Sequence, residues 1–180
     1  LHRSPIPAQR THPCDMRCLD GPRRWRWAGW AGTVGGMADR VISVSRLIKA
    51  PPEAIFALLA DPAKHGLIDG SGMVQKSRSG EGRLTLGSKF GMEMKMGPLP
   101  YRISNTVVEF EENRLIAWAH VGKHRWRYRL EPVESGTNVT EEFDWSTSAF
   151  PKGIELMGYP KKHVGNIERT LERLAAIVEQ

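Results

Sequence analysis

The chain has 180 residues and a formal net charge of +6, from 26 Lys and Arg against 20 Asp and Glu. Residues 1–36 contain six Arg, no Lys and two Asp, so residues 37–180 carry 20 basic and 18 acidic residues and are nearly neutral. This distribution argues against a nucleic-acid partner, and the lack of any run of about 18 apolar residues argues against a membrane-spanning helix.

Residues 1–36 differ in composition from the rest of the chain. They are rich in Arg, Pro, Gly and Trp and have no helical or strand periodicity, so we predict a disordered leader, explained by an upstream choice of start site or by cloning. The alternative is a twin-arginine export signal at Arg23 and Arg24, but the apolar stretch after them is short and contains Arg26. We therefore expect a cytoplasmic protein whose folded domain is residues 37–180.

The leader also contains both cysteines of the chain, Cys14 and Cys18, close to His12. Three candidate ligands without a supporting fold fall short of the four that a structural zinc site requires. We expect neither a metal nor a cofactor in this protein.

The folded domain is predicted to begin with a strand and two short helices. Residues 40–49 alternate as a half-buried strand does. Residues 50–60 predict a helix, because Pro is tolerated in the first turn and an apolar side follows. A shorter helix is expected from an N-cap at Asp61 to a stop at Gly66.

Six further strands and a long C-terminal helix complete the prediction. The strands are expected at about residues 73–79, 88–95, 101–110, 114–121, 124–133 and 138–145, with Gly, Pro and Asn between them. The terminal helix begins near Pro151, is interrupted at Gly158–Pro160, and then carries an apolar stripe at every third or fourth position. This order predicts an α+β domain in which a curved antiparallel sheet of about seven strands wraps around the terminal helix.

The clearest pattern of the chain is a hairpin over residues 124–145. One face is apolar and aromatic, with His124, Trp126, Tyr128, Leu130, Phe143 and Trp145. We expect this face, including both tryptophans, to lie beneath the terminal helix. The other face has Arg125, Arg127 and Arg129 opposite Glu142 and Asp144. Cross-strand ion pairs account for these arginines, so we interpret them as a solvated charge ladder rather than a phosphate-binding patch.

Three stretches of the domain resemble a known superfamily. They are Val44–Asp61 with its Ala-Pro-Pro-Glu-Ala-Ile-Phe-Ala-Leu-Leu-Ala-Asp-Pro segment, Val107–Trp118 with Glu-Phe-Glu-Glu-Asn-Arg-Leu-Ile-Ala-Trp, and Tyr128–Trp145. Over roughly residues 40–179, the chain resembles the START-like superfamily, and more closely its bacterial polyketide cyclase/dehydrase and lipid-transport group (SRPBCC). The resemblance implies the helix-grip fold and a deep apolar cavity, between sheet and terminal helix, that binds a hydrophobic small molecule. It implies no catalytic residue, because the group shares no catalytic motif.

Some relatives in this group are labelled RNA dimethyladenosine transferases, a chemistry that this sequence does not support. It has no Gly-rich loop after a strand for a methyl donor and no Asn/Asp-Pro-Pro-aromatic motif, since Asp61-Pro-Ala is not one. It also has no HExxH, Gly-x-Ser-x-Gly or Walker motif.

A methionine row is the main candidate for the wall of the cavity. A soft, adaptable methionine wall suits an apolar ligand, although an ordinary core gives the same pattern, and both interpretations stay open. The predicted ligand-binding residues are Phe90, Met92, Met94, Met96, Trp118, Trp126, Tyr128, Phe143, Trp145 and Met157.

Glu141 has the strand parity of Phe143, which points it toward the interior. An unpaired buried carboxylate is costly, so Glu141 needs water or a polar partner. The candidate partners are His120, His124 and Tyr128. We favour a position at the cavity mouth over the alternative, a catalytic pair of Glu141 with His124 or Tyr128 acting as general base and acid. The histidines expected at exposed helix ends or surfaces are His65 and His163.

Three functions fit this sequence. The first is a binding protein for a lipid or a polyketide-like molecule. The second is a cyclase/dehydratase acting on a polyketide-like substrate, which requires two titratable groups that converge on one substrate atom. The third is a protein-interaction module, which predicts a fully packed interior and an apolar surface patch. The sequence determines neither the ligand nor the oligomeric state.

Overall fold

The computed structural model describes residues 40–79 and 82–180. The predicted leader, its boundary at residue 36 and its two cysteines lie outside the described residues. In chain order the elements are β1 (Val41–Ile48), α1 (Pro52–Leu59), the 3-10 helix η2 (Pro62–Lys64), α2 (His65–Ile68), β2 (Val74–Ser79), β3 (Lys89–Met96), β4 (Leu99–Glu111), β5 (Leu115–His120), β6 (Arg125–Val133), β7 (Gly136–Asp144), α3 (Pro151–Leu156) and α4 (Tyr159–Val178). This order confirms the predicted α+β arrangement.

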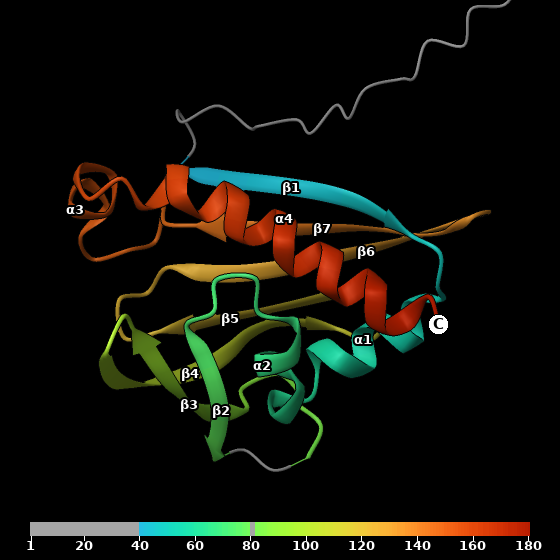
Figure 1. Cartoon of the computed structure of the whole chain (residues 1–180), viewed down its shortest axis with the longest axis horizontal. Helices are drawn as coiled ribbons and strands as arrows, with labels where there is room; N and C mark the ends of the chain where they lie inside the picture. The colour runs from blue at the N-terminus through green and yellow to red at the C-terminus, as the bar shows by residue number, and fades with distance from the viewer. Residues whose placement is uncertain (1–39, 80–81) are drawn as a thin grey trace, which may run out of the picture. The chain divides into compact units, whose positions relative to one another are not determined.

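The described strands form one antiparallel sheet in the order β1-β7-β6-β5-β4-β3-β2. The first strand therefore pairs with the last, and the remaining strands form a meander. Register shifts interrupt the β2–β3 and β4–β5 pairings, and such irregularities bend a sheet. The long helix α4 lies along one face of the curved sheet, as the helix-grip prediction requires (Figure 1).

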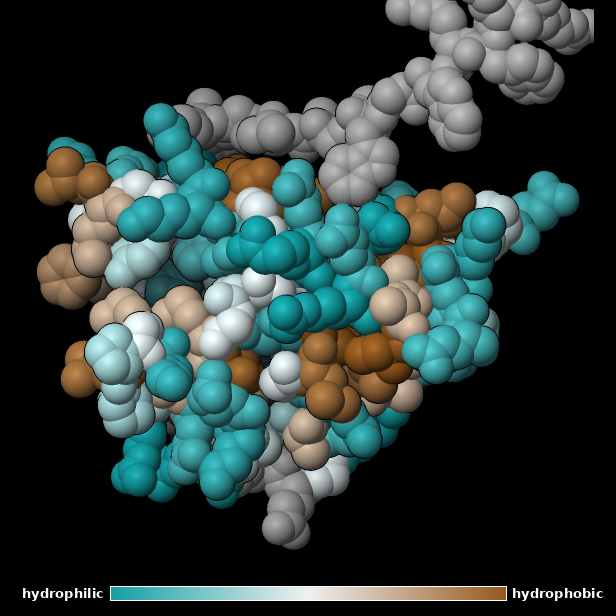
Figure 2. Space-filling model, viewed as in Figure 1, coloured by the Kyte–Doolittle hydropathy of each residue, from teal (hydrophilic) through white to brown (hydrophobic). Residues whose placement is uncertain are grey.

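Helix α4 packs its apolar stripe into the core. Ile167, Leu171 and Leu174 are fully buried, in one cluster with apolar residues of β1, β3 and β7. Its opposite face is exposed and largely hydrophilic (Figure 2), and includes Lys161 and Glu172. In the described part of the chain, no helix combines the length and the apolar character needed to cross a membrane.

The predicted interruption of the terminal helix is confirmed at Gly158. This residue has φ +67°, in the left-handed region that favours glycine, so α3 ends and α4 starts in a new direction. Pro160 then occupies the first turn of α4, where no backbone N–H is needed.

The predicted stop at Gly66 is wrong, although Asp61 caps η2 as expected by accepting a hydrogen bond from the Ala63 N–H at 3.0 Å. Helix α2 continues through Gly66 to Ile68. A Cβ at residue 66 would lie 2.6 Å from the Gln75 backbone oxygen. Glycine therefore permits close contact between α2 and β2 at this position instead of ending the helix.

The hairpin of β6 and β7 has the predicted parity. Tyr128 pairs with Glu141 across the strands, and on the other face Arg127 pairs with Glu142. Arg127 donates hydrogen bonds to Glu142 at 2.7 Å, to Asp144 at 3.4 Å, and to Glu109 at 2.6 and 2.8 Å.

The charge ladder is thus confirmed, but its solvated character is wrong at the centre. Arg127 is only 8% exposed. The carboxylate of Glu109, which comes from β4, and those of the two β7 acids surround its guanidinium and exclude water from it.

Candidate functional site

A cavity of about 470 Å³ lies between the inner face of the sheet, the segment that follows α2, and helix α4. Because strand side chains alternate between the two faces, every second residue of β3 points into it. Of the predicted ligand-binding residues, those that line the cavity are Phe90, Met92, Met94, Met96, Trp118, Trp126, Tyr128 and Phe143. The structure therefore brings together residues from four strands on one apolar and aromatic wall.

Two of the predicted residues, Trp145 and Met157, do not line the cavity. Trp145 is fully buried in the core, where it stacks on Phe143 and its indole N–H donates to Glu155 at 3.1 Å. Met157 is 58% exposed, because it follows α3, which contributes no buried residue, and precedes the break at Gly158. The positions that face inward on α4 therefore do not predict which residues before Gly158 face inward.

The acidic side chain of the cavity is Glu141. It is 3% exposed, so the predicted position at the mouth is wrong. The Tyr128 hydroxyl, opposite on β6, donates a hydrogen bond to its carboxyl group, while Oε2 has no hydrogen-bond partner among the described residues. Tyr128 is thus the partner among the predicted candidates.

Burial raises the pKa of Glu141, the hydrogen bond from Tyr128 lowers it by a smaller amount, and the negative charge of Asp69 raises it, so that the pKa is about 8 with all three effects included. The carboxyl group is therefore mostly protonated at neutral pH. Burial and the neighbouring Glu141 also raise the pKa of Tyr128, which keeps its phenol neutral.

Three histidines line another part of the same cavity. The rings of His120 and His124 are nearly perpendicular, with centroids 3.8 Å apart. His163, on α4, has its ring 4.5 Å from that of Phe143 and 5.0 Å from that of Trp126. Burial lowers the pKa of both His124 and His163 to about 4 and also lowers the pKa of His120, so these rings are uncharged at neutral pH.

The prediction that His65 and His163 are exposed is wrong. His65 is 6% exposed, hydrogen-bonds through Nε2 to the Leu59 carbonyl at 2.8 Å, and stacks on Trp118. Burial accordingly lowers its pKa. His163 precedes the buried Ile167 by four residues, so it shares the inward face of α4. That spacing is visible in the sequence and would have placed His163 correctly.

Several polar residues of the cavity had not been singled out from the sequence. They are Asp69, Ser71, Tyr101, Asn105, Tyr159, Asn166 and Thr170. Asn105 has the parity of Ile103 and Val107 on β4, which is a usable signal. Asp69 and Ser71 belong to an irregular segment, where no periodicity in the sequence indicates which way a side chain points.

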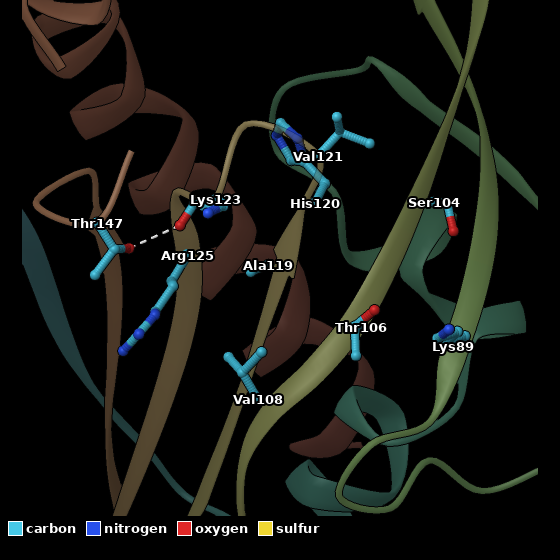
Figure 3. Close-up of a pocket in the computed structure, with 10 residues that line it drawn as sticks. All are labelled: Lys89, Ser104, Thr106, Val108, Ala119, His120, Val121, Lys123, Arg125 and Thr147. Carbon is cyan, nitrogen blue, oxygen red and sulfur yellow. Dashed lines mark hydrogen bonds between the residues drawn. The ribbon is translucent and has the colours of Figure 1, made fainter. Parts of the chain in front are cut away.

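A second hollow, of about 510 Å³, lies on the outer face of the sheet and includes Lys89, Thr106, Lys123 and Arg125 (Figure 3). Lys89 is on β3 and Arg125 on β6, with two strands between them. At about 4.8 Å per strand, the two backbones lie about 14 Å apart. Arg125 also pairs with Glu109 at 3.1 Å. This hollow is therefore a poor site for a single small anion.

Metal binding finds no support in the described residues: within 40–79 and 82–180, no three His, Cys, Asp or Glu side chains are grouped to hold an ion. The titratable groups available on the aromatic wall of the cavity are instead two carboxyl groups, three phenols and four imidazoles, from Asp69, Glu141, Tyr101, Tyr128, Tyr159, His65, His120, His124 and His163.

Comparisons with known proteins agree with the family resemblance found in the sequence. Residues 39–179 match the family described as polyketide cyclase / dehydrase and lipid transport. The chain is 38% identical over 139 residues to the uncharacterized protein Rv0088 of Mycobacterium tuberculosis, covering 74% of this chain and 62% of that protein. It therefore spans less than two thirds of the length of this relative.

Solved structures agree on the fold. Protein CV1439 from Chromobacterium violaceum has a TM-score of 0.63 at 21% identity, covering 78% of this chain and 98% of that chain. An AHSA1-like protein from Aeromonas hydrophila has a TM-score of 0.56 at 20% identity, covering 76% and 93%. Likeness at this level of identity shows the fold alone. The match over residues 39–179 shows that the chain belongs to the polyketide cyclase/dehydrase and lipid transport family.

Proposed function

We propose that this domain binds a hydrophobic small molecule, lipid-like or polyketide-like, in the cavity between the sheet and α4. The observation that carries the proposal is the cavity itself: about 470 Å³, with a surface that is mostly apolar, built from methionine and aromatic side chains and interrupted by polar groups. Small-molecule sites typically have volumes of about 300–1,000 Å³ and this kind of lining. Residues elsewhere in the core, such as Phe56 and Trp145, are fully buried and do not line this cavity.

The interaction-module hypothesis is weaker than ligand binding, because it predicts a fully packed interior, whereas this domain contains a cavity of about 470 Å³. We keep the cytoplasm as the predicted location of the binding protein.

Native mass spectrometry of the purified protein would test for a co-purifying apolar compound. In parallel, the neutral fluorescent probe N-phenyl-naphthylamine should bind with an affinity that falls at least about tenfold in Trp118→Ala and Trp126→Ala, since each loses part of the aromatic wall. Leu156→Ala is the matched control, because Leu156 is 90% exposed and lies outside the cavity. Absence of both a co-purifying compound and saturable probe binding would refute the proposal.

A cyclase/dehydratase activity is the second candidate, favoured by the hydrogen-bonded pair of Glu141 and Tyr128 in the cavity. A carboxyl group with a pKa of about 8 can both donate and accept a proton near neutral pH, as aldol closure and dehydration require. Tyr128 is better supported than His124 as the second group, since His124 contacts His120 and Phe143 instead.

The test is turnover of a poly-β-ketone by the purified protein. If Glu141 is the base, Glu141→Gln should abolish turnover while ligand affinity changes little, because Gln keeps the shape and loses the proton-transfer group. Turnover that persists in this variant would exclude Glu141 as the base.

A further inference from the structure

The charge of the cavity wall restricts what the cavity can hold. Among the described residues that line it there is no Lys and no Arg. Its histidines carry low pKa values because they are buried, so they contribute no positive charge at neutral pH. Its two acidic residues are Asp69 and Glu141. A ligand with a carboxylate or phosphate group would thus lose its hydration without forming an ion pair with a cation of the wall.

The oxygens of Asp69 are already engaged within the protein. They accept hydrogen bonds from the Ser71 N–H at 3.1 Å, from the Ser71 hydroxyl at 2.7 Å, and from the Val74 N–H at 3.0 Å. Asp69 is therefore a structural acid that holds the segment between α2 and β2. Its charge adds to the negative potential that an anionic ligand would meet.

Glu141 is different, because one of its oxygens has no partner. Oε2 is buried and without a hydrogen bond in the described part of the chain, and so is Nδ1 of His163 on α4. Both residues line the same cavity. Buried polar atoms are nearly always paired, so these two atoms indicate where a ligand places its polar groups.

The groups facing Glu141 explain which polar group fits. On β6 the neighbour is Tyr128, which donates to the carboxyl group, and on β1 it is the apolar Val44. Asp69 acts on Glu141 as a like charge. From α4 the wall receives no Lys, Arg, Asp or Glu side chain, only Tyr159, His163, Asn166, Ile167 and Thr170, and burial lowers the pKa of His163. With no cation facing it, the carboxyl group keeps its proton, and its O–H needs an acceptor.

We propose that the cavity selects its ligand by charge: it binds an uncharged apolar molecule through a carbonyl group that accepts a hydrogen bond from protonated Glu141, and it rejects the corresponding carboxylate. This inference rests on the proposed binding function and adds the chemical class of the ligand. It separates aromatic or aliphatic ketones from fatty acids and other organic acids of the same size.

The test uses three probes with one ring system: acetylnaphthalene, which is a neutral ketone, naphthoate, which is its near-isosteric anion, and naphthylmethylamine, which is a cation. Near neutral pH, we expect the ketone to bind at least about tenfold more tightly than naphthoate and more tightly than the amine. Affinities are measured by quenching of tryptophan fluorescence, since Trp118 and Trp126 line the cavity.

The role of Glu141 is tested by the pH dependence of ketone binding. With a pKa of about 8, Glu141 is about nine-tenths ionised at about pH 9, so the ketone affinity should fall about tenfold from its neutral value. In Glu141→Gln the ketone affinity should stay within a few-fold of wild type and lose this pH dependence, because the amide N–H still donates. Glu131→Gln, at an exposed position of β6 outside the cavity, should behave as wild type.

Tighter binding of either ion than of the ketone, or a pH profile unchanged in Glu141→Gln, would overturn the inference. These outcomes are distinguishable from failure of the proposed function. If N-phenyl-naphthylamine binds but the ketone has no advantage over naphthoate, charge selection alone is refuted. If neither N-phenyl-naphthylamine nor any of the three probes binds, the binding function and the selection inferred from it are refuted together.

Discussion

Replacing Glu141 by Gln should remove a pH dependence of stability that the wild-type protein carries above about pH 6.5. Burial raises the pKa of Glu141 from 4.5 to about 8, so the folded state keeps a proton that the unfolded state has lost. Because the folded state binds more protons in this range, the free energy of unfolding falls as the pH rises. The loss levels off above about pH 8, where the folded state also ionises.

The size of this change in the free energy of unfolding follows from the pH range in which Glu141, and not the histidines, changes its protonation. Below pH 6.5 the buried histidines have the opposite effect on the free energy of unfolding. Their pKa is about 4 in the folded state for His124 and His163, so between about pH 4 and 6.5 the unfolded state binds protons that the folded state does not bind. Between pH 6.5 and a pKa of about 8 there remain about 1.5 pKa units. At about 1.4 kcal/mol per unit, wild type should lose about 2 kcal/mol relative to Glu141→Gln.

The assay is urea denaturation, followed by tryptophan fluorescence in half-unit steps between about pH 6.5 and about pH 9. The matched control is Glu131→Gln, whose carboxylate is exposed and solvated in both states. This control should follow the wild-type curve. Parallel curves for wild type and Glu141→Gln over the whole range would refute the reasoning, since Glu141 would then have the same pKa in both states.

Further substitutions test the core, the charge ladder and the packing of α4. Trp145→Ala should cost about 3–5 kcal/mol in chemical denaturation, because Trp145 is fully buried, whereas Trp126→Ala should cost less and weaken probe binding, because Trp126 lines the cavity. Arg127→Met should cost about 3–5 kcal/mol, because three carboxylates lose their shared partner, and a change below about 1 kcal/mol would contradict this. Gly70→Ala should lower the Tm and the stability by about 1–3 kcal/mol, because the new Cβ would lie 2.2 Å from the backbone of α4. Gly165→Ala in α4 is its control and should be neutral or stabilising, because its Cβ would meet only a flexible side chain.

Local patterns in the sequence determined the elements and their faces. Strand side chains alternate with a period of two, so the sequence alone separated Tyr128 from Arg127 and assigned Glu141 to the interior. The break at Gly158 was equally predictable, since Gly and Pro act within a few residues of their own position. The order of the elements and the three resembling stretches then sufficed to predict the helix-grip fold.

Only the tertiary structure decided which inward residues line a cavity and which fill the core. Trp126 and Trp145 have equivalent parity in a hairpin, yet Trp126 lines the hollow and Trp145 is packed against Phe143 and Glu155. The difference depends on how much volume the opposing elements leave at each point. That volume is set by the placement of α4 against the sheet and not by any local pattern.

The state of Glu141 was decided in the same way. Its position in the strand indicated that its side chain points inward. Its burial, its hydrogen-bond partner and its raised pKa depend instead on Tyr128, on Asp69 and on the packing of α4 over the sheet. Arg127 likewise finds a partner on β4, Glu109, which is distant in sequence. Desolvation and pairing depend on neighbours from distant segments of the chain, whereas hydrophobic periodicity reports only on a residue's own element.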